Sequence, residues 1–361
     1  MSSLNGAHLS LLMAIQEKPL ATVTELVNRV AGSKPTVIKR LSYLRKNQFF
    51  KVKALLDLYN MGFDTVEVLL DTTNLKDVVK LERIATNHPY TSYRSRCFGF
   101  HNGLYLQFRI PTGSRGNIDE IIKILKEDGT IVGHRILAIG DEPTINTGMK
   151  LDGWNPDSMS WKFDWEKWFE ADFNTIKSEK AKKPSGSVLE WITKSDLHIL
   201  QQLMYSAKRS NTEMIRAIHE SGISFTPQTF GRRLRMVDEQ CVAKYRVSFK
   251  PIAFDIISNI LITGTGKKKY LNEIYSKMSS EPIPFESTMR VTESELFWVV
   301  RMPPSHLSSL LSNLHLNLEN MTVTIIDYPN SYLYSIWPEI LDEENRVWRQ
   351  DREFMIDQAL K

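Results

Sequence analysis

The chain has 361 residues, of which 42% are hydrophobic, 10% aromatic and 24% charged, a composition that supports buried cores and excludes wholesale disorder. Its length predicts two or three domains. The net charge of +4 does not by itself indicate a nucleic-acid partner, and the two cysteines, Cys97 and Cys241, lack the spacing of a metal site or a disulfide framework.

The first 141 residues change from helical to strand periodicity. Helices are predicted around Leu9 to Ile15, over Thr24 to Val30, and from the N-cap Ser33 onward, where Val37, Leu41 and Leu44 form an apolar face. The pattern then predicts a strand at 66–70, a helix at 74–86, strands at 90–98 and 104–110, a helix at 117–126 and a strand at 135–139. This copy therefore reads as three helices followed by a β-α-β-β-α-β unit.

A second copy of this pattern follows. The run Leu104 to Pro111 recurs 192 residues later as Leu296 to Pro303, and each run ends in Arg-x-Pro. The second β-α-β-β-α-β series is predicted at 256–263, 268–278, 285–291, 296–302, 306–318 and 322–326. We therefore predict an α+β chain made of two tandem modules, at 1–141 and 194–329.

Two further segments lie outside this pattern. Trp161, Trp165 and Trp168 have helical spacing and predict one aromatic stripe, which we expect the protein's own sheet to cover. The lysine-rich run 178–187 reads as a solvated linker. Residues 342–360 read as a charged helix with Val347, Trp348 and Met355 on its apolar side.

The third helix of each copy carries the clearest chemical signal. Residues 33–56 contain seven basic residues and no acidic one. A third helix that presents Lys, Arg and Thr beyond a tight turn is how helix-turn-helix proteins fill the major groove. A solvated basic face is the other interpretation, but a basic third helix occurs in both copies.

The segment Ser33-Lys-Pro-Thr-Val-Ile-Lys-Arg-Leu resembles the recognition helix of the Lrp/AsnC transcription regulators, and so does Thr226-Pro-Gln-Thr-Phe-Gly-Arg-Arg-Leu. Val242 to Pro251 resembles the wing of that family and the strand that follows. The resemblance implies winged helix-turn-helix domains at 1–60 and 194–252 and ferredoxin-like domains at 61–141 and 253–330. A Trp-rich helix and linker at 142–193 and a C-terminal helical tail at 331–361 complete the chain.

The family often binds an amino acid at a Gly-x-x-Asp turn, and this chain departs from that pattern. Copy one has Gly99-Phe-His101-Asn102-Gly103 at this position, so Gly99, His101 and Asn102 are the candidate effector residues, with an ordinary hairpin connection as the alternative. Copy two has Thr292-Glu-Ser-Glu, without a glycine.

A second resemblance, around His88, Tyr93, Arg94 and His101, is to siroheme decarboxylases, which share this domain plan and work with histidines. Copy two has no histidine between His219 and His306, and an enzyme has no need of basic third helices. We therefore expect no enzyme, cofactor or metal.

These patterns predict a sequence-specific DNA-binding transcription regulator that forms an internal pseudo-dimer or a homo-oligomer. Its partners would be double-stranded DNA and transcription machinery. A protein-interaction scaffold and a decarboxylase-like enzyme are the alternatives. No apolar run is long enough to cross a bilayer, so we expect a cytoplasmic, nucleoid-associated protein. The predicted DNA-binding residues are Lys34, Thr36, Lys39, Arg40, Tyr43, Arg45, Lys46, Thr226, Gln228, Thr229, Arg232, Arg233, Arg235, Lys244 and Arg246.

Overall fold

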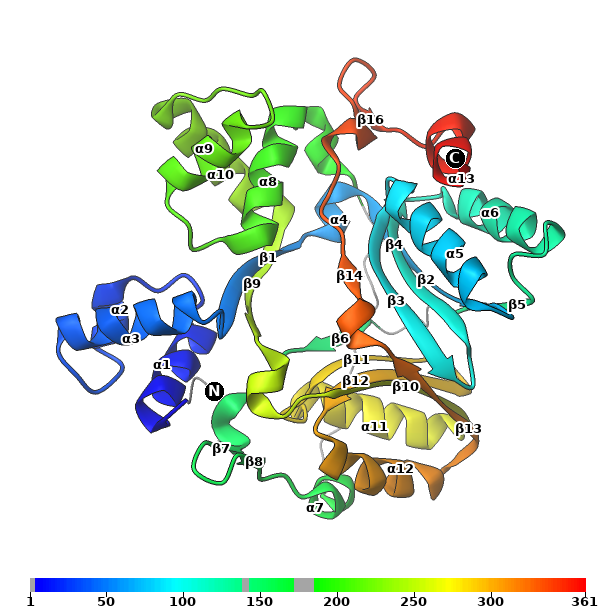
Figure 1. Cartoon of the computed structure of the whole chain (residues 1–361), viewed down its shortest axis with the longest axis horizontal. Coiled ribbons are helices and arrows are strands. Elements are labelled where there is room, and N and C mark those ends of the chain that lie inside the picture. The colour runs from blue at the N-terminus through cyan, green and yellow to red at the C-terminus, as the bar shows by residue number, and fades with distance from the viewer. Residues whose placement is uncertain (1–3, 138–142, 172–184) are drawn as a thin grey trace. The chain divides into compact units, whose positions relative to one another are not determined.

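The computed structural model describes residues 4–137, 143–171 and 185–361. The chain forms two compact units, each assembled from separated segments. Unit 1 comprises residues 1–52, 138–181 and 246–325, and unit 2 comprises residues 53–137, 182–245 and 326–361. Each unit therefore combines the three-helix half of one copy with the ferredoxin-like half of the other. Figure 1 labels the elements.

The three helices of unit 1 are α1 (Gly6–Glu17), α2 (Val23–Val27) and α3 (Lys34–Lys46). Thr22 and Glu25 form a capping box at the start of α2, and Pro35 lies in the first turn of α3. Both features suit helix starts, whose first N–H groups have no partner inside the helix. The helices pack through the buried side chains of Leu11, Leu12, Ile15, Leu26, Val37, Leu41 and Leu44.

The sheet of unit 1 has the order β13-β10-β12-β11-β6, and all the paired strands for which a register is given are antiparallel. Its elements are β6 (Ile145–Thr147), β10 (Ser258–Gly266), α11 (Lys268–Ser280), β11 (Glu286–Val291), β12 (Glu295–Met302), α12 (Leu307–His315) and β13 (Leu318–Ile326). The predicted β-α-β-β-α-β order is confirmed, with β6 added at the edge beside β11.

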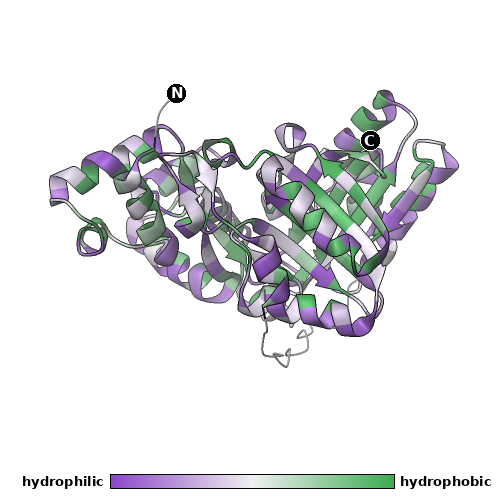
Figure 2. Ribbon diagram, turned by 90° about the horizontal axis from the view of Figure 1, so that it is seen from below, coloured by the Kyte–Doolittle hydropathy of each residue, from purple (hydrophilic) through white to green (hydrophobic). Residues whose placement is uncertain are grey.

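Unit 2 repeats this plan. Its helical half is α8 (Lys194–Ser206), α9 (Asn211–His219) and α10 (Pro227–Cys241). Its ferredoxin-like half is β2 (Phe63–Asp71), α5 (Leu75–Asn87), β3 (Thr91–Gly99), β4 (Gly103–Pro111), α6 (Arg115–Glu127) and β5 (Gly133–Ile136), in the sheet order β5-β2-β4-β3. The alternating residues Val66, Val68 and Leu70 of β2 are buried in the core with apolar residues of α5 and α6. Hydrophobic residues run along the strands, and hydrophilic residues are prominent on the helices (Figure 2).

The predicted wing at Val242 to Pro251 is wrong. These residues form β9 (Val242–Phe249), which pairs with β1 (Phe50–Leu56) of the other copy instead of folding into a hairpin. In unit 2, the backbone N–H of Asp57 donates to the carbonyl of Cys241 at 2.8 Å, and in unit 1 that of Lys250 donates to Phe49 at 2.9 Å. Local patterns correctly indicated a strand but could not specify a partner strand almost 200 residues away.

The segments that follow the two ferredoxin-like halves also differ from expectation. Trp161 lies on β8 (Ser160–Trp161), which pairs with β7 (Trp154–Asn155), while Trp165 and Trp168 lie on α7 (Trp165–Glu170). The predicted helix at 342–360 is instead β15 (Leu341–Asp342) and β16 (Val347–Trp348), followed by a π-helical turn at Glu353–Asp357 and α13 (Gln358–Leu360). The predicted linker at 178–187 lies outside the described residues except for its last three.

These two segments are one further element of the repeat. Trp161 Nε1 donates to the carbonyl of Phe254 at 2.7 Å, and Trp348 Nε1 donates to that of Met61 at 2.6 Å. The residue two positions before each tryptophan has a left-handed backbone, with φ of 50° at Met159 and 56° at Arg346. All the tryptophans of the predicted stripe are buried, and Trp165 and Trp168 pack near Trp298 of β12, so the protein's own sheet covers them as expected.

The remaining elements are short. They are α4 (Leu58–Met61), β14 (Tyr332–Leu333) paired with β3, and 3-10 turns at Leu151–Gly153, Ser187–Glu190, Pro251–Phe254, Pro304–His306, Tyr328–Asn330 and Pro338–Ile340. No helix in the described ranges is both long and apolar enough to cross a membrane.

Candidate nucleic-acid interface

Helix α3 presents three lysines whose side chains have no partner. Lys34, Lys39 and Lys46 are exposed, and within the described part of the chain none of them forms a hydrogen bond or an ion pair. Arg45 is also exposed on this helix. Because α3 contains no acidic residue, its surface carries an uncompensated positive charge.

Other predicted residues of α3 stabilise the helical half itself. Arg40 Nη1 donates to the carbonyl of Ala31 at 2.7 Å, in the turn before the helix. The Tyr43 ring stacks on the His8 ring with centroids 4.8 Å apart. The Thr36 hydroxyl lies 3.0 Å from that of Ser33, near the N-terminus of the helix. These three side chains are therefore positioned by their own unit.

Helix α10 divides its predicted residues in the same way. Gln228, Arg232 and Arg235 are exposed, and none of them forms a hydrogen bond or ion pair with another described residue. Thr226 is the N-cap of α10 and accepts from the backbone N–H of Thr229 at 3.1 Å. Capping leaves the two threonines at the exposed start of the helix, beside Gln228.

Arg233 is held inside unit 2. Its Nε donates to Asp196 Oδ1 at 2.7 Å, its Nη2 donates to Asp196 Oδ2, and the guanidinium lies 5.2 Å from the Trp191 ring centroid. Asp196 is fully buried. The hydrogen bond with Asp196 raises the pKa of Arg233. This arginine was predicted to contact DNA, and the structure assigns it a partner within the protein.

The two predicted strand residues also differ. Lys244 on β9 is exposed. Arg246 Nη2 donates to Glu286 Oε1 at 2.7 Å and to the carbonyl of Thr147 at 3.0 Å, so its charge is matched inside unit 1. Of the two, Lys244 is the one whose side chain faces solvent.

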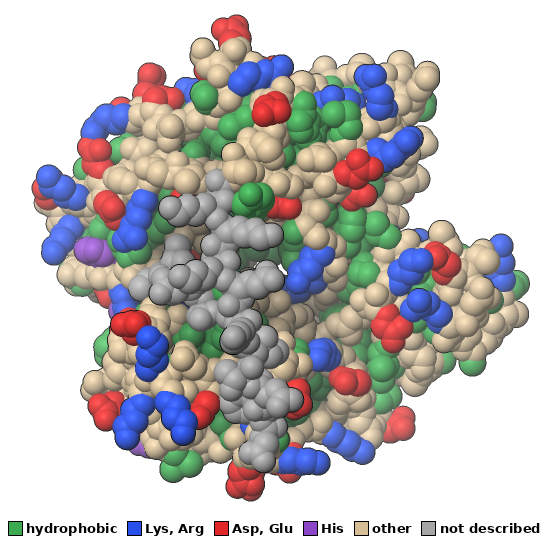
Figure 3. Space-filling model, turned by 180° about the vertical axis from the view of Figure 1, so that it is seen from behind, with side chains coloured by type: hydrophobic (Ala, Val, Ile, Leu, Met, Phe, Trp, Pro, Cys, Tyr) green, Lys and Arg blue, Asp and Glu red, His purple; other side chains and the backbone are tan. Residues whose placement is uncertain are grey.

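The third helices of the two copies agree in only part of their length. An offset of 193 residues aligns Lys39 with Arg232 and Arg40 with Arg233. The same offset places Asp238 and Glu239 of α10 where α3 has Arg45 and Lys46. Elsewhere, basic and acidic side chains are interspersed over the face drawn in Figure 3. The unmatched positive charge is therefore local and is greater on α3 than on α10.

The candidate effector loop is satisfied by its own residues. The Asn102 side chain accepts from Gly99 N at 3.2 Å and donates to Gly99 O at 2.8 Å. His101 Nδ1 lies 3.0 Å from a carboxylate oxygen of Asp71, while its Nε2 is buried without a partner among the described residues. This arrangement is that of a closed hairpin connection between β3 and β4.

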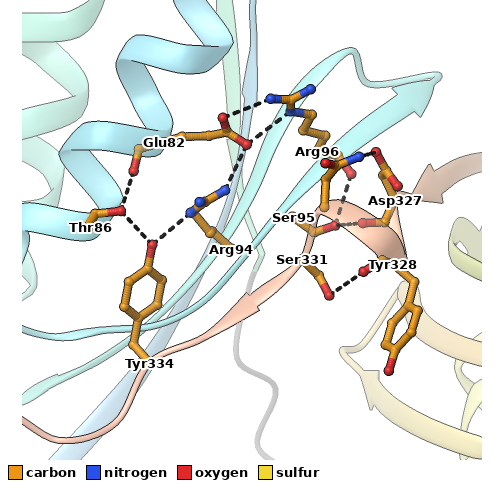
Figure 4. A network of polar contacts seen from close by, with 10 residues as sticks. Glu82, Thr86, Arg94, Ser95, Arg96, Asp327, Tyr328, Ser331 and Tyr334 are labelled. Carbon is orange, nitrogen blue, oxygen red and sulfur yellow. Dashed lines mark hydrogen bonds and ion pairs between the residues drawn. The ribbon is translucent and has the colours of Figure 1, made fainter. Parts of the chain in front are cut away.

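The residues that resemble the decarboxylases have separate surroundings. His88 is buried, and desolvation lowers its pKa to about 3, so it is neutral inside the apolar core between β2, α5 and α6. Arg94 and Arg96 both pair with Glu82, at 2.8 and 3.0 Å, and Tyr334 accepts from Arg94 Nε at 2.7 Å (Figure 4). This network holds the C-terminal segment against β3.

Sequence reasoning missed two features of unit 2, namely the burial of Asp196 beside Arg233 and a pocket around Arg109 and Thr91. The repeat contained a signal for the pocket. Copy two has Glu286 to pair with Arg301, and copy one has no acid in the matching stretch 89–93 next to Arg109. Comparing the charge partners of the repeated arginines would have exposed the difference.

No protein-family model and no curated protein matches the sequence. Among solved structures, the siroheme decarboxylase NirDL is similar over 94% of this chain and 96% of its own, with 12% identity and a TM-score of 0.46. The transcriptional regulator NMB0573 from Neisseria meningitidis, in complex with L-Met, is similar over 42% of this chain and 98% of its own, with 19% identity and a TM-score of 0.34. AsnC from E. coli is similar over 40% and 98%, with 13% identity and a TM-score of 0.33.

These similarities bear on two expectations. The α+β fold of two modules is confirmed, and Lrp/AsnC-type regulators are similar to part of the chain. The expectation that the chain is not an enzyme is contradicted, because the similarity that extends over nearly the full length is to an enzyme. The reasoning had failed at its premise that an enzyme would not keep basic third helices.

Proposed function

We propose that the chain binds double-stranded DNA through α3 and α10 and regulates transcription. The supporting observation is that Lys39 and Arg232 occupy the same position in the two repeated third helices, are exposed, and have no bonding partner among the described residues. The proposal concerns these two helix surfaces and is compatible with catalysis elsewhere in the chain.

A cation left in water on a helix face gains free energy from a phosphate mainly by releasing counterions from the DNA. Lys34, Lys39 and Arg232 have the charge and exposure for such contacts. Gln228, in the first turn of α10, has a carboxamide that can form a bidentate pair with adenine in the major groove. Phosphate contacts would position the helices, and Gln228 would supply part of the sequence preference.

The unequal charge of the two helices predicts an unequal share of the binding. Asp238 and Glu239 oppose phosphate approach to the C-terminal half of α10, whereas Arg45 and Lys46 favour it on α3. We therefore expect α3 to supply most of the electrostatic affinity and α10 to contribute through its first turns.

Salt-dependent fluorescence anisotropy with a labelled random-sequence duplex tests this function. Lys39→Ala and Arg232→Ala should each weaken binding and reduce the slope of log K against log salt by about 1, because each removes about one phosphate contact. Lys76→Ala removes an exposed lysine from α5 in the ferredoxin-like half and is the matched control. Unchanged affinity and slope in both test variants would refute the proposal.

The exchange of halves between the copies supports an internal pseudo-dimer, because both copies contribute to each compact unit. One polypeptide would then present two helix-turn-helix parts without a second chain. The alternative, a protein-interaction scaffold, predicts no dependence of DNA association on salt, so the same titration separates the two functions.

A further inference from the structure

A buried arginine of unit 2 lacks the acidic partner that its repeat equivalent has. Arg301, in the second Arg-x-Pro sequence, is paired with Glu286, with Nη1 and Oε2 3.2 Å apart. Glu286 lies directly opposite Arg301 in the β11–β12 register. Copy two thus shows what this position of the fold accommodates, namely a guanidinium with a carboxylate beside it.

Copy one has the arginine without the carboxylate. The backbone N–H of Arg109 donates to the carbonyl of Tyr90, which places Tyr90 opposite it, and the Tyr90 hydroxyl donates to the carbonyl of Arg349 at 2.6 Å. Arg109 Nη2 donates to the carbonyl of Tyr334 at 3.0 Å, and no carboxylate among the described residues pairs with the guanidinium. Burial lowers the pKa of Arg109 to about 10, so the side chain is still charged at neutral pH.

A buried charge without a counter-charge is costly, and proteins ordinarily pair such groups. The guanidinium lines a pocket of about 230 Å³, part of it open to solvent. Thr91 lines the same pocket, is 3% exposed, and its hydroxyl has no hydrogen-bond partner among the described residues. A charged donor and an unused hydroxyl therefore lie in one cavity whose other walls are mainly apolar.

We propose that this pocket binds a small carboxylate, which the Arg109 guanidinium and the Thr91 hydroxyl hold as Arg301 holds Glu286 in the other copy. An arginine fork matches the planar, two-oxygen geometry of a carboxylate better than it matches a spherical anion. The apolar walls, which include Phe63 and Ile336, suit a short hydrocarbon chain. The pocket is smaller than the roughly 300 to 1,000 Å³ typical of drug-sized ligands, so a ligand of the size of acetate or a short fatty acid fits.

The site is separate from the proposed DNA surface. It is formed by β3, β4 and the C-terminal segment of unit 2, whereas the exposed cations lie on α3 and α10. Failure of DNA binding would leave the carboxylate site intact, and the reverse also holds.

Isothermal titration of acetate into the full-length chain tests the proposal. The wild-type chain should bind acetate saturably at one site, and Arg109→Gln should weaken binding by at least about tenfold through loss of a charge-assisted pair. Thr91→Val, which keeps the side-chain shape, should weaken it by about threefold to tenfold. Arg301→Gln is the matched control and should bind as the wild type does, because its guanidinium already has Glu286 as a partner.

A second measurement covers the case in which Arg109→Gln does not fold. Acetate should raise the melting temperature of the wild-type chain and neutral acetamide should not, while Arg109→Lys should fold and show a smaller rise. Equal effects of acetate and acetamide would overturn the proposal, as would undiminished acetate binding in Arg109→Gln. Competition by chloride as strong as that by propionate would overturn the assignment to a carboxylate.

Discussion

Arg232 and Arg233 are neighbours in the sequence, and the structure predicts opposite consequences for their removal. Arg233 makes two charge-assisted hydrogen bonds to Asp196, whose side chain is fully buried. Arg232 is exposed and has no partner among the described residues. Arg233→Ala should therefore destabilise unit 2, while Arg232→Ala should leave it folded and weaken DNA binding.

The cost of Arg233→Ala follows from what Asp196 keeps. Its remaining partner is Thr193, whose N–H and hydroxyl donate to Oδ2 at 2.8 and 2.7 Å. Removing one partner of a buried ion pair typically costs about 3 to 5 kcal/mol, because the other charge remains desolvated. The lost packing of the guanidinium on the Trp191 ring adds about 0.5 to 1 kcal/mol. An exposed substitution such as Arg232→Ala changes stability by less than about 0.5 kcal/mol.

Urea unfolding followed by circular dichroism measures both variants. We expect the transition of unit 2 to move to markedly lower urea in Arg233→Ala and to remain in place in Arg232→Ala. The double variant Asp196→Leu/Arg233→Met should recover most of the loss, since an apolar pair can replace a buried ion pair, apart from about 1 kcal/mol for the α8 cap. Equal stability of Arg232→Ala and Arg233→Ala would refute the reasoning.

Three further predictions concern other parts of the fold. The pKa of His88 is lowered to about 3 in the folded chain from 6.5, so only the unfolded chain takes up this proton as pH falls from 6.5 to 3, and stability is lost over that window. His88→Gln should flatten the urea-stability profile between these pH values by several kcal/mol, whereas a Gln at the exposed His315 should leave it unchanged. Trp348→Phe should lower stability by about 1 kcal/mol through loss of the hydrogen bond to Met61, and full stability by calorimetry would contradict this role. The fragment 1–141 lacks the segments that complete both units, so light scattering should show dimers or aggregates, and a well-folded monomer would show that the copies fold independently.

The sequence determined the elements and their repetition. Alternating apolar residues such as Val66, Val68 and Leu70 specify a strand with one buried face, and caps such as Ser33 mark where helices start. The duplicated Arg-x-Pro sequences revealed the two copies. Such signals are local, because each arises from the geometry of a few consecutive residues.

Only the tertiary structure decided how the halves combine and which side chains remain available. The pairing of β1 with β9 and the exchange of halves between the units depend on contacts between residues almost 200 positions apart. Periodicity could not separate Arg232 from Arg233, because their roles depend on whether a buried Asp196 lies within reach. It also could not show that Arg109 has lost the carboxylate that Arg301 retains. A charged residue's role depends on its desolvation and its partners, and both are fixed only when the chain has folded.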